Sequence, residues 1–133
     1  MANANLLAIL VAALSGFLIG GLWYGPLFGK AWQREAGLSA ETMGQTNPIK
    51  LFGLTFLFSV LSAVFLGHML AHIGGDAKST MMISVGVAIG FILPAFGTNY
   101  LFGRKSATLF AIDAGYWIVF YAAMGAVFVL LGT

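Results

Sequence analysis

Asp113 is the residue with the clearest chemical potential in this chain. It lies in the stretch 106–133, which is otherwise uncharged and long enough to cross a bilayer. An ionisable side chain at that depth is costly, so it marks either a functional site or a polar contact between helices. As a site, the carboxyl group would bind a cation, exchange a proton or accept hydrogen bonds from a small polar solute. As a contact, it would fix helix packing with one hydrogen bond.

The depth of Asp113 predicts one neighbour. At 1.5 Å per residue, Asp113 lies roughly 10 Å from Ser106, where its helix begins, and Asn99 lies about 7 Å from Arg104, where the preceding helix ends. Because the two helices are antiparallel, the side chains of Asn99 and Asp113 are expected to meet. The sequence therefore predicts a polar cluster in the half of the bundle next to Arg104.

Four more side chains are predicted to join this cluster. Thr55 lies at a similar depth in another apolar run, and Tyr116 lies nearly one turn beyond Asp113. Trp23 and Tyr24 would flank the mouth of the cluster; the alternative is that these rings only anchor a turn at headgroup depth. The predicted ligand-binding set is Asp113, Asn99, Thr55, Tyr116, Tyr24 and Trp23.

Catalytic side chains do not come together in the same way. The chain has no cysteine, and both histidines, His68 and His72, fall at the opposite end of the predicted bundle from Asp113. No serine or threonine therefore has a histidine and a carboxylate on its own membrane face, and no glycine-rich phosphate-binding loop is present. We expect no catalytic residue, no cofactor and no enzyme activity.

The two histidines are a separate candidate for metal binding. His68 and His72 are spaced i, i+4, so both imidazoles can lie on one helical face and share a metal ion. No third strong ligand is evident. We therefore favour interfacial histidines that hydrogen-bond to headgroups, water or a neighbouring helix, and we predict no metal site.

The composition identifies the medium in which these side chains are held. Of 133 residues, 60% are hydrophobic and only 8% are charged, and the mean hydropathy is +0.97. Water-soluble domains carry far more charge, so the lipid bilayer is the expected partner of most of the surface. A net charge of +2 is too small to indicate nucleic-acid binding.

Four apolar runs satisfy the roughly 20 residues that a helix needs to cross the hydrocarbon layer. They cover residues 5–24, 48–73, 80–102 and 106–131, and the first is expected to be a retained span and not a cleaved signal peptide. Lipid cannot satisfy free backbone groups, so the runs are expected to be helices. We predict one all-α integral membrane domain over residues 1–133 with four transmembrane helices. Residues 30–37 are expected to form a short interfacial helix, with a polar connector as the alternative.

Basic residues are distributed unequally between the two ends of the predicted bundle. One end has only Lys78, beside Asp76. The other end carries Lys30, Arg34, Lys50, Arg104 and Lys105. By the positive-inside rule, both termini are expected to face outward from a bacterial cytoplasmic membrane.

The two halves of the chain share a weak echo. Tyr24 is closely followed by Leu-Phe-Gly-Lys at the end of the first run, and Tyr100 is followed by Leu-Phe-Gly-Arg at the end of the third. A Leu-Phe pair then precedes Thr55 in the second run and Asp113 in the fourth at equal spacing. The echo favours two pseudo-repeated hairpins about a twofold axis; chance similarity is the alternative, because Leu and Phe are abundant.

Small residues and a proline predict features of helix packing. Pro94 lacks an N–H and its ring clashes with the preceding turn, so the third helix is expected to bend there. Three glycine pairs have the spacing that lets backbones approach closely, within one chain or between copies. These pairs are Gly16 with Gly20, Gly21 with Gly25, and Gly86 with Gly90.

Three segments carry a family resemblance. They are Gly21-Leu-Trp-Tyr-Gly-Pro-Leu-Phe-Gly-Lys-Ala-Trp32, Ala36-Gly-Leu-Ser39 and Asp113-Ala-Gly-Tyr-Trp117. With them the chain resembles, over nearly its whole length, the bacterial membrane family catalogued as domain of unknown function 1761. The resemblance implies a compact four-helix protein of the bacterial cytoplasmic membrane and brings no established activity. It also implies that an asparagine often replaces Asp113, which favours hydrogen bonding as the shared role of that position.

Two function classes remain open. We favour a small polytopic membrane protein that binds or passes an ion or small polar solute at the polar cluster. Four short helices enclose little volume, so this protein is expected to act as a homo-oligomer. The alternative is a noncatalytic accessory or scaffold protein whose glycine-rich faces dock partner helices.

Overall fold

The computed structural model of the protein describes residues 5–133, apart from the side chains of Ala40 and Met43. Every regular element in those residues is a helix. Four helical segments are long and apolar enough to cross a membrane: Leu6–Leu27, Pro48–Ile73, Ala77–Phe102 and Ala107–Leu131. The predicted all-α fold with four long helices is therefore confirmed, and the helix ends lie within a few residues of the predicted ones.

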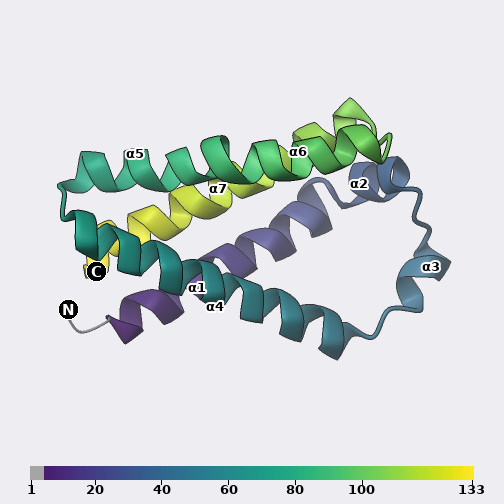
Figure 1. The fold of residues 1–133 in the computed structure, drawn as a ribbon. Helices are drawn as coiled ribbons and strands as arrows, with labels where there is room; N and C mark the ends of the chain where they lie inside the picture. Colours follow the sequence, from purple (N-terminus) through teal and green to yellow (C-terminus); the bar gives the residue numbers. More distant parts are fainter. Residues whose placement is uncertain (1–4) are drawn as a thin grey trace.

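The long segments are connected by short turns and by two small helices. The first segment is α1 (Leu6–Leu22) followed by the π-helical turn η1 (Trp23–Leu27), and α2 (Gly29–Ala36) and α3 (Ala40–Gly44) lead to α4 (Pro48–Ile73). The third segment is α5 (Ala77–Val87), η2 (Ala88–Ile92) and α6 (Leu93–Phe102), and the fourth is α7 (Ala107–Leu131). Figure 1 shows the start of α1 and the end of α7 at one end of the bundle, with α2, α3 and the α6–α7 turn at the other.

Polar side chains define where the long segments begin. Four side chains each accept a hydrogen bond from a backbone N–H in the first turn of the helix that follows: Asn5, Asn47, Asp76 and Ser106. The hydrogen bond from the backbone of Ser79 lowers the pKa of the Asp76 carboxyl group, which lies in the loop before α5. These caps explain why the runs read from the sequence match the observed helices.

α1 is the central helix of the bundle. It packs along α7 on one side and along α4 on the other, while α5 packs on α7. α4 and α5 contact each other little, so the two halves of the bundle diverge on that side. A twofold axis would make the α4–α5 contact equal to the α1–α7 contact, and the packing does not have that symmetry. The two hairpins are therefore packed unequally.

The glycine pairs fall into two groups. A Cβ at Gly16 would lie 2.3 Å from the Phe120 ring, and one at Gly20 would lie 3.1 Å from the Tyr116 hydroxyl, so both glycines allow α1 to approach α7. The other four glycines would meet nothing within 4 Å among the described residues: Gly21, Gly25, Gly86 and Gly90. Only the first pair therefore supports packing inside this chain.

Two of the three prolines, Pro26 and Pro94, lie in or next to a π-helical turn. Pro26 lies inside η1, where the N–H of Phe28 donates to the carbonyl of Trp23 at 2.8 Å. Pro94 is the second residue of α6, which follows η2 directly. A π turn is wider than an α turn and accommodates a missing N–H donor, so η2 provides for the missing N–H of Pro94.

Candidate functional site

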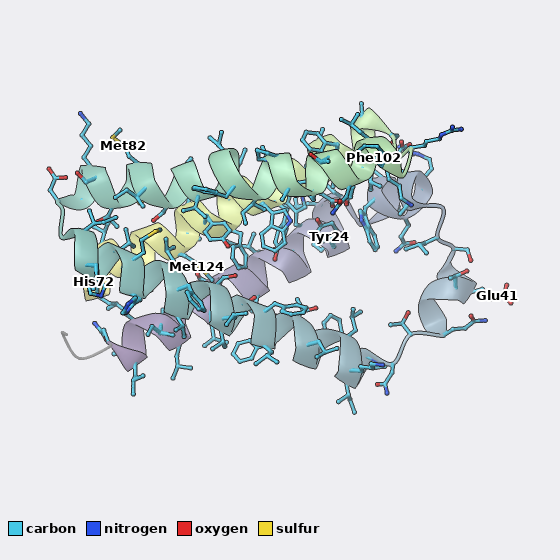
Figure 2. The ribbon with its side chains drawn as sticks, viewed as in Figure 1. Tyr24, Glu41, His72, Met82, Phe102 and Met124 are labelled. Atoms are coloured by element: carbon cyan, nitrogen blue, oxygen red, sulfur yellow. The ribbon has the colours of Figure 1, made fainter. Side chains whose placement is uncertain are left out.

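The carboxyl group of Asp113 is the centre of the candidate site. The residue lies in α7 and is only 6% exposed. The Tyr24 hydroxyl donates a hydrogen bond to Oδ1 at 2.5 Å, and the Tyr100 hydroxyl donates one to Oδ2. Figure 2 shows Tyr24 at the end of the bundle where α6 ends near Phe102. Each carboxyl oxygen thus has a hydroxyl donor from a different part of the chain.

Three elements bring these groups together. Asp113 lies six residues beyond the start of α7, which places it about 9 Å from the start of that helix. Tyr100 lies in the last turn of α6, and the short turn to α7 makes the two helices antiparallel neighbours. Tyr24 belongs to η1, which packs against α1 and α2. The site therefore forms only when the ends of three long segments meet.

Trp23 fixes η1 against α7. Its indole Nε1 donates to the backbone carbonyl of Ile112 at 2.9 Å, one residue before Asp113. A Cβ at Gly115 would lie 2.8 Å from the Trp23 ring, so the indole occupies the space that this glycine leaves open. The contact keeps Tyr24, the next residue, within reach of the carboxyl group.

An aromatic layer surrounds the Tyr24 ring. It packs edge-on against Trp32 of α2, with ring centroids 5.3 Å apart, and against Tyr116 of α7 at 5.2 Å. The Tyr116 hydroxyl points to the carbonyl of Gly16 at 3.5 Å and does not bond to Asp113. Tyr116 therefore belongs to the wall of the site and not to its polar centre.

A second polar contact holds α2 on the same end of the bundle. Ser106, which caps α7, also donates a hydrogen bond to Glu35 at 2.7 Å. The other carboxyl oxygen of Glu35 lies 3.6 Å from Arg34. Gly37 then ends α2 in a left-handed conformation with φ +74°. The predicted helix at residues 30–37 is thus present, and it is tied to the start of the helix that carries Asp113.

Two predicted members of the cluster lie outside it. Asn99 is exposed, and the hydrogen bond expected from it comes instead from the next residue, Tyr100. Successive residues on a helix point about 100° apart, so a depth estimate alone cannot choose between them. Thr55 bonds to the carbonyl of Leu51 in its own helix, and α4 packs mainly on α1, away from α7.

Tyr100 is the functional candidate that the sequence reasoning missed, although the sequence carried a signal for it. In the echo between the two halves, Tyr24 precedes one Leu-Phe-Gly segment by three residues and Tyr100 precedes the other directly. Those two tyrosines are the ones that hold the carboxyl group of Asp113. The echo therefore pointed to the right pair of donors, even though Thr55 does not match Asp113 in its surroundings.

The carboxyl group of Asp113 has no basic partner in the described part of the chain. The one ion pair within residues 5–133 joins Arg34 to Glu35. A buried carboxyl group held by two hydroxyls offers two oxygens that a cation can bind in place of these donors. The arrangement suits reversible binding more than a fixed structural ion pair.

The two histidines lie at the far end of the bundle. Figure 2 shows His72 near the loop between α4 and α5, opposite to Tyr24. The rings of His68 and His72 pack edge-on with centroids 4.4 Å apart. The described residues contain no group of three or more His, Cys, Asp or Glu side chains that could hold a metal ion.

The sequence comparisons agree with the resemblance stated above. Residues 7–129 match the profile of a family described as Protein of unknown function (DUF1761), which confirms that resemblance. Two proteins from Streptococcus thermophilus, of strains CNRZ 1066 and ATCC BAA-250 / LMG 18311, are also similar, and both are named glycerol-3-phosphate acyltransferase. Each is 31% identical over 130 residues, which cover 94% of this chain but only 60% of the relative. No solved structure matches the chain.

The name of these relatives corrects one expectation. We expected no enzyme activity, and relatives named as an acyltransferase contradict that expectation. The lack of a serine–histidine–carboxylate set does not exclude an enzyme, because a single carboxylate can serve as the general base for a hydroxyl group.

Proposed function

Since the chain belongs to the DUF1761 family, whose description assigns no activity, we propose a function from the geometry of its site: it binds or passes a cation, a proton or a small polar solute at Asp113. One observation carries the proposal. A buried carboxyl group in a helix long enough to cross a membrane is held, among the described residues, only by the hydroxyls of Tyr24 and Tyr100. A carboxyl group at such depth is costly unless it has a function or a specific partner.

The surroundings support access from one membrane face. Tyr24 and Tyr100 are both only partly buried, and they lie at the end of the bundle where α6 meets α7. The hydroxyls can turn from the carboxyl group toward a ligand, because a phenol both donates and accepts hydrogen bonds. Trp23 and Tyr116 lie beside these groups, so four of the predicted ligand-binding residues remain candidates: Asp113, Tyr24, Tyr116 and Trp23.

The experiment compares the purified protein with the variant Asp113→Asn in lipid nanodiscs. The amide preserves the size of the side chain but removes the charge and the exchangeable proton; its oxygen can accept from one tyrosine hydroxyl, and its NH2 group can donate to the other. Thermal unfolding is followed in Na⁺, in K⁺ and across pH, and proteoliposomes are tested for dissipation of a pH gradient. We expect a saturable cation or proton response in the native protein and none in Asp113→Asn.

The matched control is Asp76→Asn, which removes a carboxyl group from the exposed loop before α5. This variant is expected to respond like the native protein. An Asp113→Asn protein that folds and keeps the full response would show that the site is a structural contact only.

We propose that the protein works as a homo-oligomer in the bacterial cytoplasmic membrane, with both termini outside. Four exposed glycines in the long segments offer close-packing faces that no helix of the same chain covers among the described residues. Five of the six Lys and Arg residues, all except Lys78, lie at the end of the bundle opposite to the start of α1 and the end of α7, which favours this orientation. Four short helices enclose little volume, so a path for a solute would form between copies of the chain.

A second candidate function is acyl transfer, favoured by the relatives named glycerol-3-phosphate acyltransferase. Asp113 would take the proton from an acceptor hydroxyl as its oxygen attacks the acyl carbonyl and the donor's leaving group departs. Basic residues at the same end of the bundle, Arg104 among them, suit a phosphate-bearing acceptor. The same Asp113→Asn protein tests this candidate in an assay with an acyl donor and glycerol 3-phosphate. Acylated product from the native protein and none from the variant is the expected result.

A further inference from the structure

A groove lies on the side of the bundle where α4 and α5 diverge. Its volume is about 410 Å³, within the range of small-molecule sites. The aromatic ring of Phe65, the thioether of Met69 and the side chain of Val87 form much of its wall. Phe65 is largely exposed, so the groove opens sideways toward the lipid.

Two hydroxyl groups line this apolar groove without a partner. Tyr121 is only 6% exposed, yet its hydroxyl makes no hydrogen bond with any group in the described chain, and the same holds for the hydroxyl of Ser62. Among the described residues, every side-chain nitrogen or oxygen atom that is fully enclosed has a hydrogen-bond partner. The Tyr121 and Ser62 oxygens are therefore open to the groove. A buried tyrosine hydroxyl usually has a hydrogen-bond partner, so these groups indicate a ligand with acceptor oxygens.

The depth of the two hydroxyls limits what that ligand can be. Tyr121 lies ten residues before the end of α7, and Ser62 lies eleven before the end of α4, which places both about 15 Å inside the segments. The hydrocarbon layer is about 30 Å thick, so these residues lie near its middle. The ester oxygens of a phospholipid stay at the edges of that layer. A plain acyl chain reaches the middle but carries no acceptor there.

We propose that the groove binds a lipid-soluble ring compound with carbonyl oxygens, the chemistry of a quinone. Its carbonyl oxygens accept hydrogen bonds from Tyr121 and Ser62, and its ring packs against Phe65 and Met69. Lipid hydrocarbon is as apolar as the groove wall, so the hydrocarbon tail gives no preference and the hydroxyls supply the selectivity.

This site is separate from the one at Asp113. Tyr121 follows Asp113 by eight residues on α7, which corresponds to about 12 Å along the helix. The rings of Trp117 and Tyr121 are 6.3 Å apart, so Trp117 reports on the groove.

The experiment titrates decyl-ubiquinone into the protein in nanodiscs and follows quenching of tryptophan fluorescence. A saturable quench that disappears in Trp117→Phe is expected. Tyr121→Phe removes only the hydroxyl and is expected to weaken apparent affinity about three- to tenfold. Ser62→Phe fills the groove and should abolish the saturable phase.

The matched control is Val64→Phe, which adds the same ring on the same helix at an exposed position outside the groove. It is expected to leave the titration unchanged. Equal affinity of the native protein and Tyr121→Phe would overturn the proposal, and this outcome is readable even where Ser62→Phe fails to fold. Displacement of decyl-ubiquinone by an equal concentration of hexadecane would also overturn it, since the groove would then select hydrocarbon alone. Neither result depends on the response of Asp113→Asn.

Discussion

At the scale of single residues, Asp113 joins three segments of the chain through two hydroxyl groups. The Tyr24 and Tyr100 hydroxyls are its side-chain donors among the described residues. Hydrogen bonds to charged groups contribute about 1.5–3 kcal/mol in soluble proteins, whereas polar contacts inside membrane bundles average about 0.6 kcal/mol. Because both tyrosines are only partly buried, we expect each bond to contribute an intermediate amount.

The first prediction concerns this pair of donors. Tyr24→Phe and Tyr100→Phe should each lower the free energy of unfolding by about 1 kcal/mol, because each removes one hydrogen bond to Asp113. In an Asp113→Ala background the same changes should have little effect. Reversible unfolding in mixed micelles measures both, as a double-mutant cycle.

Tyr116→Phe is the control, because its hydroxyl contacts Gly16 and not Asp113. Its effect should be the same in both backgrounds. A loss from Tyr100→Phe that is equally large without the carboxyl group would show that the tyrosine acts through packing alone.

Sequence reasoning identified the central residue of the site but not all of its partners. The sequence alone predicted Asp113, Tyr24 and Trp23 as candidates, because an ionisable residue in an apolar run and an aromatic pair at a helix end are strong local signals. The choice between Asn99 and Tyr100 depends on the rotation of α6 about its axis. Packing against α7 decides that rotation, and no pattern within the segment records it.

At the scale of elements, the contact between α1 and α7 depends on glycine. Gly16→Ala should lower the free energy of unfolding by about 1–3 kcal/mol, because the added Cβ overlaps the Phe120 ring. Gly86→Ala should be neutral or stabilise by about 0.5–1 kcal/mol, since nothing lies near it and alanine favours the helix. Unfolding of the two variants under one set of conditions provides the comparison.

The two positions are matched in type, since both open a Gly-x-x-x-Gly pair. Equal destabilisation by both changes would contradict the packing described for α1 and α7. Loss of an oligomer in Gly86→Leu with unchanged monomer stability would instead support the proposed contact between copies.

The boundaries of the elements were predictable for local reasons. Capping residues such as Asn47 and Ser106 act within one turn, and Pro94 acts on the turn before it, so a single segment contains the information. The unequal contacts of α4 and α5 were not predictable, because the echo in the sequence suggested a symmetric arrangement. The extensive contact between α1 and α7 has no equal between α4 and α5, so the packing is not symmetric.

At the scale of the whole molecule, the asymmetry of charge predicts how the bundle crosses the membrane. The chain contains no cysteine, so single cysteines can be introduced without a background. A membrane-impermeant maleimide should label Thr133→Cys in intact spheroplasts. Ser39→Cys, in the loop between α2 and α3, should react only after the membrane is permeabilised.

Both positions are exposed, so differences in reactivity report the side of the membrane and not burial. Labelling of Ser39→Cys in intact cells, with Thr133→Cys protected, would reverse the proposed orientation. The site at Asp113 would then open to the outside.

The position of α1 has a consequence for how the protein is made. During synthesis, α1 emerges from the ribosome before α7, its largest packing partner. Until then Trp23 lacks the carbonyl of Ile112 and Tyr24 lacks its carboxyl acceptor. Until α7 is made, α1 therefore stays in the translocation machinery or in the lipid without this partner. A chain that is truncated before α7 would have no assembled site.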